Sequence, residues 1–164
     1  MYLKYPHLTK GLKINETNEL IDQELIFFNL PSLEKVDFLK KLISLIVEKK
    51  GHLNESIVSE LIIKREELCS TALDNYIAIP HAKIPGIDKT YLSIGICDSG
   101  IAFESIDSLN TKIFIMILHP EETGNHHLEI LKLVSNLFIK KDIVAELLAI
   151  KDSEEIIKYI KDNE

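Results

Sequence analysis

Four of the six histidines fall within one stretch of the 164-residue chain: His81, His119, His126 and His127. Neutral imidazole is a nucleophile near neutral pH and also a common metal ligand. His81 and His119 each follow an apolar run that is typical of a β-strand, and His126 and His127 stand where a helix is predicted to begin. If both strands present their carboxyl ends to one sheet edge, where ligands of α/β proteins bind, these imidazoles share a site there.

A phosphate is the ligand that suits these groups. The free backbone N–H groups at a helix N-terminus favour an anion. Arg65 is the only arginine of the chain, beside 18 lysines, and a planar guanidinium binds phosphate through paired, directed hydrogen bonds. Arg65 also falls on the apolar stripe of its predicted helix, between Ile62 and Leu68. It therefore either lays its stem on the core and holds its charge in water, or reaches into a cleft.

The alternative is a metal site, as in a zinc-dependent enzyme. His119, His126 and His127 are close in sequence, but they lack the HExxH spacing, and no Asp or Glu completes a recognisable ligand set with them. We therefore predict no metal. The sequence also contains no GxSxG nucleophile elbow, no P-loop and no GxGxxG motif. For His119 a structural role at the strand end is favoured over a functional one, whereas helical spacing does not distinguish His126 from His127.

The elements that position these residues alternate along the chain. Apolar patterns predict strands at 25–28, 76–79, 91–97 and 113–118. The strand at 91–97 alternates as a half-buried strand does, whereas the last one is expected to be central and covered on both faces. Helices are predicted to open at Ser32 and at Asn54, to start again near 125, and to run over 141–149 and over 152–162 with Ser153 as the cap. We expect His81 in a loop, because Pro80 cannot donate a hydrogen bond in the middle of a sheet.

This alternation predicts an α/β fold, a mixed β-sheet flanked by helices in a single compact domain. Residues 1–19 are polar and weakly patterned, so we expect a loose N-terminal arm before a domain at 20–164. The composition is that of an ordinary globular protein, with 46% hydrophobic residues and a net charge of −7. Disorder is thereby excluded, and an acidic chain is a poor candidate for binding nucleic acid.

The sequence also predicts a cytoplasmic protein without direct membrane insertion. Its longest apolar run, Ile113 to Leu118, is far too short to span a bilayer, and the N-terminus lacks the apolar core of a signal peptide. Cys69 and Cys97 have neither a disulfide pattern nor a CxxC zinc spacing. We expect both thiols to be reduced and buried.

Three stretches of sequence resemble one family. The run from Arg65 to Leu73, REELCSTAL, and the run from Ile77 to Lys83, IAIPHAK, resemble the enzyme IIA domain of the phosphoenolpyruvate-dependent phosphotransferase system. The type is that of fructose and mannitol, which includes a nitrogen-related regulatory branch. The stretch from His127 to Leu133 resembles the second histidine motif of this family, and the resemblance covers about residues 20–162. Tyr76 stands where the family often has glycine.

The resemblance implies a phosphotransferase component that carries a phosphohistidine and needs no cofactor. His81 would accept the phosphoryl group from the histidine phosphocarrier HPr and pass it to an enzyme IIB domain in sugar transport. His127 would be the second active-site histidine, Arg65 would hold the phosphoryl group or orient a loop, and Ser70 would support the site through a hydrogen bond. The alternative is a regulatory, nitrogen-type protein that controls its protein partners by its phosphorylation state, without sugar transport.

Overall fold

The computed structural model describes residues 20–122, 124–140 and 142–163, and the predicted N-terminal arm lies outside them. The strands are β1 (Ile21–Phe27), β2 (Ile77–Ala78), β3 (His81–Ile84), β4 (Tyr91–Ile101) and β5 (Thr111–Pro120). The helices of the described residues are α2 (Lys35–Lys49), α3 (Glu55–Leu68), α4 (His126–Phe138), α5 (Ile143–Ala149) and α6 (Ser153–Asp162). None of these helices is long and apolar enough to cross a membrane.

The five strands form one mixed sheet in the order β1-β4-β5-β2, and β3 also pairs with β5. β4 and β5 are antiparallel, whereas β1 pairs with β4, and β2 and β3 pair with β5, in parallel. β5 therefore has neighbours on both sides, and all its residues from Ile113 to His119 are buried. The predicted central strand is confirmed, as is the α/β class with a mixed sheet flanked by helices in one domain.

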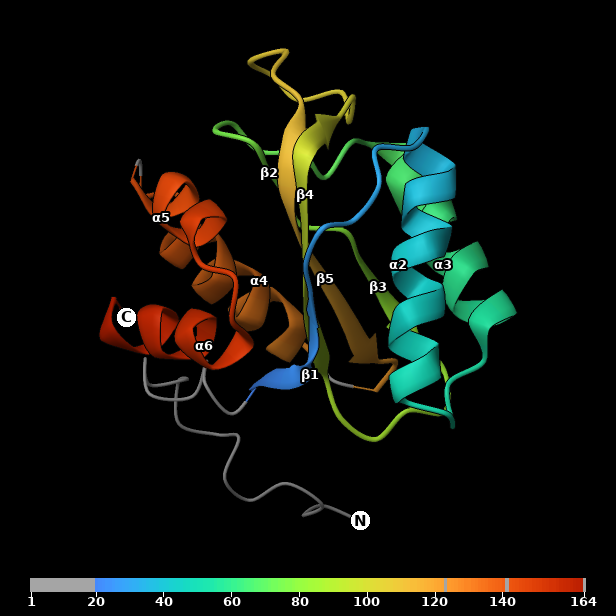
Figure 1. The fold of residues 1–164 in the computed structure, drawn as a ribbon. Helices are drawn as coiled ribbons and strands as arrows, with labels where there is room; N and C mark the ends of the chain where they lie inside the picture. Colours follow the sequence, from blue (N-terminus) through green and yellow to red (C-terminus); the bar gives the residue numbers. More distant parts are fainter. Residues whose placement is uncertain (1–19, 123, 141, 164) are drawn as a thin grey trace.

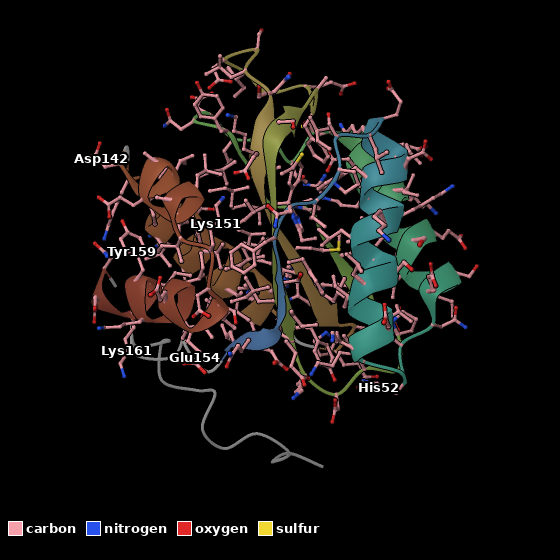
Figure 2. All side chains as sticks on the ribbon, viewed as in Figure 1. His52, Asp142, Lys151, Glu154, Tyr159 and Lys161 are labelled. Atoms are coloured by element: carbon pink, nitrogen blue, oxygen red, sulfur yellow. The ribbon has the colours of Figure 1, made fainter. Side chains whose placement is uncertain are left out.

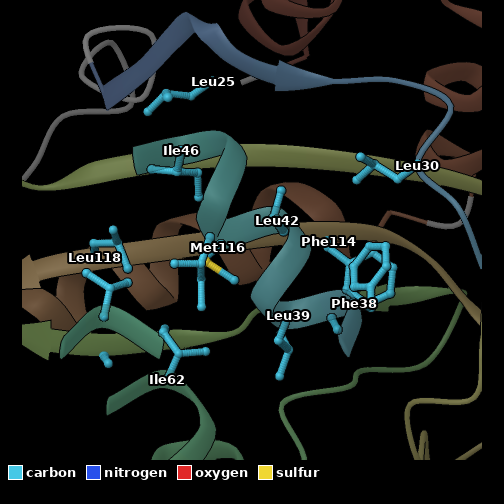
Figure 3. Close-up of a cluster of buried hydrophobic side chains, with 14 of the residues drawn as sticks. Leu25, Leu30, Phe38, Leu39, Leu42, Ile46, Ile62, Phe114, Met116 and Leu118 are labelled. Carbon is cyan, nitrogen blue, oxygen red and sulfur yellow. The ribbon is translucent and has the colours of Figure 1, made fainter. Parts of the chain in front are cut away.

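Helices cover both faces of the sheet (Figure 1): α2 and α3 lie on one side and α4, α5 and α6 on the other. Along β5, Phe114 and Met116 pack toward α2, whereas Ile115 and Ile117 pack toward the α4–α6 side. Figure 3 shows the first of these clusters, in which Phe38 and Phe114 lie against each other with ring centroids 4.2 Å apart. Side chains fill the spaces on both sides of the sheet (Figure 2).

Because both faces are covered, one expectation for β4 is wrong. The alternation of Tyr91 to Cys97 predicts a half-buried strand, but all seven residues are buried. Leu92 and Ile94 pack in the core below α4–α6, and the small residues Ser93 and Gly95 face the other way. A Cβ on Gly95 would come within 2.9 Å of Leu30 Cδ1, so the alternation marks close packing of α2 and the chain before it, not a solvent face.

The prediction that His81 lies in a loop beyond a short strand is also wrong. β2 stops at Ala78, but the chain continues beside β5, and His81 opens β3 in parallel register with Ile117. Pro80 interrupts the run without ending the pairing, because its carbonyl oxygen accepts the Ile117 N–H at 2.9 Å. The missing N–H of proline matters little here, since β3 pairs with β5 alone among the described strands and lies at the sheet edge.

Helix starts follow the predicted caps in part. Asn54 caps α3, because its side chain accepts the Ile57 N–H at 3.1 Å. α2 begins at Lys35 and not at Ser32, whose hydroxyl instead donates to the Gly100 carbonyl at 2.8 Å. α6 is capped by Asp152, one residue before the predicted Ser153, and a carboxylate accepts the free N–H groups of a first turn well.

Candidate functional site

Two imidazoles of the candidate site are oriented in the same way. The Nδ1 atom of His81 lies 2.8 Å from the Ile79 carbonyl oxygen, and the Nδ1 atom of His127 lies 2.9 Å from the Gly124 carbonyl oxygen. A carbonyl oxygen only accepts, so each Nδ1 carries the hydrogen and donates it. In the neutral ring the lone pair therefore resides on Nε2. Both rings are thus held in the same tautomer, with Nε2 as the unprotonated nitrogen.

The sheet and α4 bring these two histidines to one edge. Ile79 and Ile117 pack in the core below α4, and His81, two residues after Ile79, projects from the same face of the edge strand. β5 ends at Pro120 beside β3, and α4 begins six residues later with His126 and His127 in its first turn. The carboxyl ends of β3 and β5 and the first turn of α4 thus lie at one edge, but His81 opens β3 in register with Ile117 and does not follow a strand end as predicted.

The surroundings of His81 favour its neutral form. The ring is half-buried. Its pKa lies below the ordinary value of 6.5, chiefly because burial penalises the charged form. The positive charges of Arg65 and His127 lower the pKa further, whereas the Ile79 hydrogen bond and the Glu66 carboxylate oppose the shift. His81 is therefore available as an unprotonated nucleophile at neutral pH.

Arg65 lies in the last turn of α3, and the choice between its two predicted alternatives stays a prediction. Its Nη1 donates to the Cys69 carbonyl at 3.0 Å, across the end of the helix. Arg65 as a residue is half-buried, and its positive charge contributes to lowering the pKa of His81. One N–H of five is used in the Cys69 contact, so the group retains a fork of donors with which to hold an anion.

Ser70 orders the loop between α3 and β2. Its hydroxyl donates to the Phe103 carbonyl at 2.7 Å and accepts the Ala72 N–H at 3.2 Å. These two bonds attach the loop to the chain that follows β4. A direct hydrogen bond from Ser70 to a bound phosphoryl group remains a prediction.

His119 is a third imidazole at this edge of the sheet, at the end of β5 as predicted. It is buried, with 1% of its surface exposed, and its ring centroid lies 5.9 Å from that of His127. Its Nδ1 is 3.4 Å from the Thr90 hydroxyl, and its Nε2 has no hydrogen-bond partner among the described residues. Burial, aided by the charges of His127 and His81, lowers the pKa of His119 to about 3. His119 is thus held in its neutral form near neutral pH, with its ring beside that of His127.

A signal for His119 was present in the pattern of β5. Ile113, Ile115 and Ile117 share one face of this strand, and His119 continues their spacing toward the edge where α4 begins. His126 differs, because its Nδ1 lies 3.7 Å from the Glu129 carboxylate one turn along α4. Within the described part of the chain, no three His, Cys, Asp or Glu side chains are grouped to hold a metal ion.

The geometry thus combines a neutral nucleophilic nitrogen, an arginine, a second imidazole and a helix N-terminus. Comparison with known proteins leads to a phosphotransferase family. The family model "Phosphoenolpyruvate-dependent sugar phosphotransferase system, EIIA 2" matches residues 19–163. A nitrogen regulatory protein of Bradyrhizobium diazoefficiens is 33% identical over 142 residues, which are 87% of this chain and 92% of that protein.

A fructose-specific EIIABC component of the same transport system from Bacillus subtilis is 31% identical over 147 residues, 89% of this chain. The chain spans only 23% of the length of that relative. Among solved structures, the nitrogen regulatory protein IIA-Ntr from Neisseria meningitidis superposes with a TM-score of 0.81 at 24% identity, covering 88% of this chain and 98% of its own. The Escherichia coli complex of enzyme IIAMTL and phosphorylated enzyme IIBMTL gives 0.71 at 17% identity, with 87% and 97% covered.

Proposed function

The chain belongs to the EIIA 2 family of the phosphoenolpyruvate-dependent sugar phosphotransferase system, and on that premise we propose that it carries a phosphoryl group on Nε2 of His81. The observation that carries the proposal is the hydrogen bond from His81 Nδ1 to the Ile79 carbonyl. It directs the lone pair of the neutral ring to Nε2, and the lowered pKa of His81 keeps that lone pair free of a proton.

The transfer is a substitution at phosphorus. The Nε2 lone pair of His81 forms a bond to the phosphorus of a phosphohistidine on HPr, the proposed donor. The donor's P–N bond breaks, and its electron pair returns to the donor imidazole. His81 keeps its hydrogen on Nδ1, and the positive charge that the ring gains strengthens its bond to the Ile79 carbonyl. In the onward transfer a nucleophile of the acceptor forms the new bond to phosphorus, the P–Nε2 bond breaks, and its electron pair returns to His81.

Charge around His81 supports this step. A phosphoryl group brings roughly −1.5 to −2 charges. The Arg65 guanidinium and the first turn of α4 offer donors and positive potential to offset them. His127 adds a donor at Nε2 only in its protonated form, because its Nδ1–H is used by the Gly124 carbonyl. In a loose phosphoryl-transfer transition state, positioning and electrostatics supply most of the rate enhancement.

The proposed acceptor is an enzyme IIB domain. The solved complex of a IIA with a phosphorylated IIB shares the fold of this chain, which supports such a partner. A second candidate is regulation of protein partners by the phosphorylation state. It is favoured by the nitrogen regulatory relative, of which the chain covers 92%, whereas it covers 23% of the fructose-specific relative.

The test is phosphorylation in solution. The protein is incubated with enzyme I, HPr and phosphoenolpyruvate, and its intact mass is compared with those of His81→Ala and His127→Ala. We expect one acid-labile phosphoryl group on the wild type, none on His81→Ala, and slower labelling of His127→Ala. A label that persists on His81→Ala would overturn the assignment.

A second arm separates the two candidate functions. The isolated phosphoprotein is mixed with a fructose- or mannitol-type IIB domain, and loss of its phosphoryl group is followed by mass. Rapid discharge to IIB supports the carrier in sugar transport. A phosphoprotein that is stable in the presence of these IIB domains favours the regulatory function.

A further inference from the structure

A buried carboxylate next to Arg65 takes no part in the proposed transfer. Glu66 is 6% exposed, and an ion of this kind is costly to bury unless its oxygens are paired. Its Oε1 lies 3.0 Å from Nζ of Lys35, the first residue of α2. Because Glu66 directly follows Arg65 on α3, its side chain leaves the helix in a different direction from that of Arg65.

Both oxygens of Glu66 hold one residue of the following loop. The Thr71 backbone N–H donates to Oε1 at 2.9 Å, and the Thr71 hydroxyl donates to Oε2 at 2.6 Å. Thr71 is itself buried. The carboxylate thereby fixes both the backbone and the side chain of Thr71, and Lys35 balances its charge.

Thr71 in turn holds the chain that leads to His81. The Thr71 carbonyl accepts the Ile79 N–H at 3.0 Å, and a bridge between Ala72 and Ala78 extends this pairing. The Ile79 carbonyl then accepts the hydrogen of His81 Nδ1 at 2.8 Å. An unbroken series of hydrogen bonds thus runs from Glu66 through Thr71 and Ile79 to the imidazole.

We propose that Glu66 is a positioning residue that acts through Thr71 to fix the Ile79 carbonyl, and with it the tautomer and orientation of His81. The inference rests on the proposed function of His81. Each hydrogen bond fixes the position of the next residue, so the carboxylate that anchors Thr71 also holds the Ile79 carbonyl in place. A carbonyl that moves by a fraction of an ångström would release Nδ1–H and redirect the Nε2 lone pair.

Two substitutions of Thr71 test the series with little change in shape. Thr71→Val deletes the hydroxyl that donates to Glu66, whereas Thr71→Ser keeps it and serves as the matched control. The tautomer of His81 is measured by ¹⁵N NMR of the imidazole, and the Ile79 linkage by amide hydrogen exchange. Phosphoryl uptake from saturating phospho-HPr gives the rate constant, and its concentration dependence gives the apparent affinity.

For Thr71→Val we expect faster exchange at Ile79, a smaller fraction of the Nδ1–H tautomer and about tenfold slower uptake at unchanged affinity for HPr. Thr71→Ser should stay within about twofold of the wild type in each measurement. Glu66→Gln, which keeps the shape of the side chain without its charge, should resemble Thr71→Val. A folded Thr71→Val protein with the wild-type tautomer and uptake rate would overturn the proposal.

The NMR and exchange measurements use the unphosphorylated protein, so they also separate the two proposals. If the wild type takes no phosphoryl group but Thr71→Val still shifts the tautomer of His81, the proposed function fails and the positioning role of Glu66 stands. If the wild type is labelled at His81 and Thr71→Val changes neither tautomer nor rate, only the positioning role fails. Should Glu66→Gln not fold, the Thr71 pair decides alone.

Discussion

The rings of His119 and His127 lie 5.9 Å apart between centroids at an interplanar angle of 69°. One comes from the end of the central strand β5 and the other from the first turn of α4. The pairing places a fully buried, neutral imidazole directly behind a half-buried one at the candidate site. Its consequence for the molecule is a pH-dependent stability that can be assigned to a single residue.

The first prediction concerns the acid side of the stability curve. His119 titrates near pH 6.5 when unfolded, whereas its folded pKa is about 3. Below about pH 6 the unfolded chain therefore binds more protons, and the free energy of unfolding falls as pH drops. Compared with His119→Val, which cannot bind this proton, the wild type should lose an extra ~1.4 kcal/mol per pH unit between about pH 6 and pH 4. Urea unfolding at a series of pH values measures the difference.

A control for that comparison lies two residues earlier on β5. Ile117→Val removes one buried methyl group without a titratable site, so it should lower the free energy of unfolding by about 0.5–1.5 kcal/mol at every pH. Parallel stability curves for the wild type and His119→Val would show that His119 takes up its proton in the folded protein as readily as in the unfolded chain.

The second prediction concerns Arg65. Arg65→Lys keeps the positive charge but loses the planar fork and its Nη1 bond to the Cys69 carbonyl. We expect phosphoryl uptake to slow by about tenfold or more, with little change in melting temperature. Transfer from phospho-HPr is quenched at a series of times, and the intact mass of the protein at each time gives the rate. As a control, Lys64→Gln removes an exposed charge one residue away and should take up the phosphoryl group at nearly the wild-type rate. Equal rates for Arg65→Lys and the wild type would exclude a directed role for the guanidinium.

The third prediction concerns Tyr76, which lies directly before β2. Its φ is +68° and that of Asn75 is +61°, a left-handed conformation that costs energy for a bulky residue. Tyr76→Ala and Tyr76→Gly both remove the ring that lies by Lys112, with Nζ 5.6 Å from the ring centroid, but only glycine removes the backbone strain. The glycine variant should therefore unfold with a free energy about 1 kcal/mol higher than the alanine variant.

The control for this test is the same pair of substitutions at Leu109, an exposed loop residue that is not in the left-handed region. There the order should reverse, with Leu109→Ala more stable than Leu109→Gly because glycine gains more entropy on unfolding. Chemical denaturation of the four variants gives the two differences. A glycine variant at position 76 that is less stable than its alanine counterpart would show that the turn carries no strain.

The fourth prediction concerns the thiols. Both cysteines are free, as expected, but only Cys97 is buried, and the expectation of a buried Cys69 is wrong. Cys69 follows the last residue of α3, where the helix leaves the core, whereas burial raises the pKa of Cys97 and makes its thiol unreactive. A thiol-specific reagent should therefore label one site in the native protein and two after unfolding. Cys69→Ser should abolish native labelling, and Cys97→Ser should leave it unchanged.

Much of this molecule could be predicted from local patterns. The alternation of strands and helices, the central strand around Ile115 and the Asn54 cap follow from periodicity and capping, which depend on residues within a few positions of one another. The residue types of the site were visible for the same reason: an isolated arginine and histidines at the ends of predicted elements stand out in the sequence.

Other features were decided by the tertiary structure alone. His81 lies in a strand because β5, which begins 30 residues later, supplies its hydrogen-bonding neighbours past Pro80. His119 became a neutral partner of His127 only when α4 folded back over the end of β5. Burial, hydrogen-bond partners and pKa values depend on groups brought together from distant parts of the chain, so no local pattern contains them.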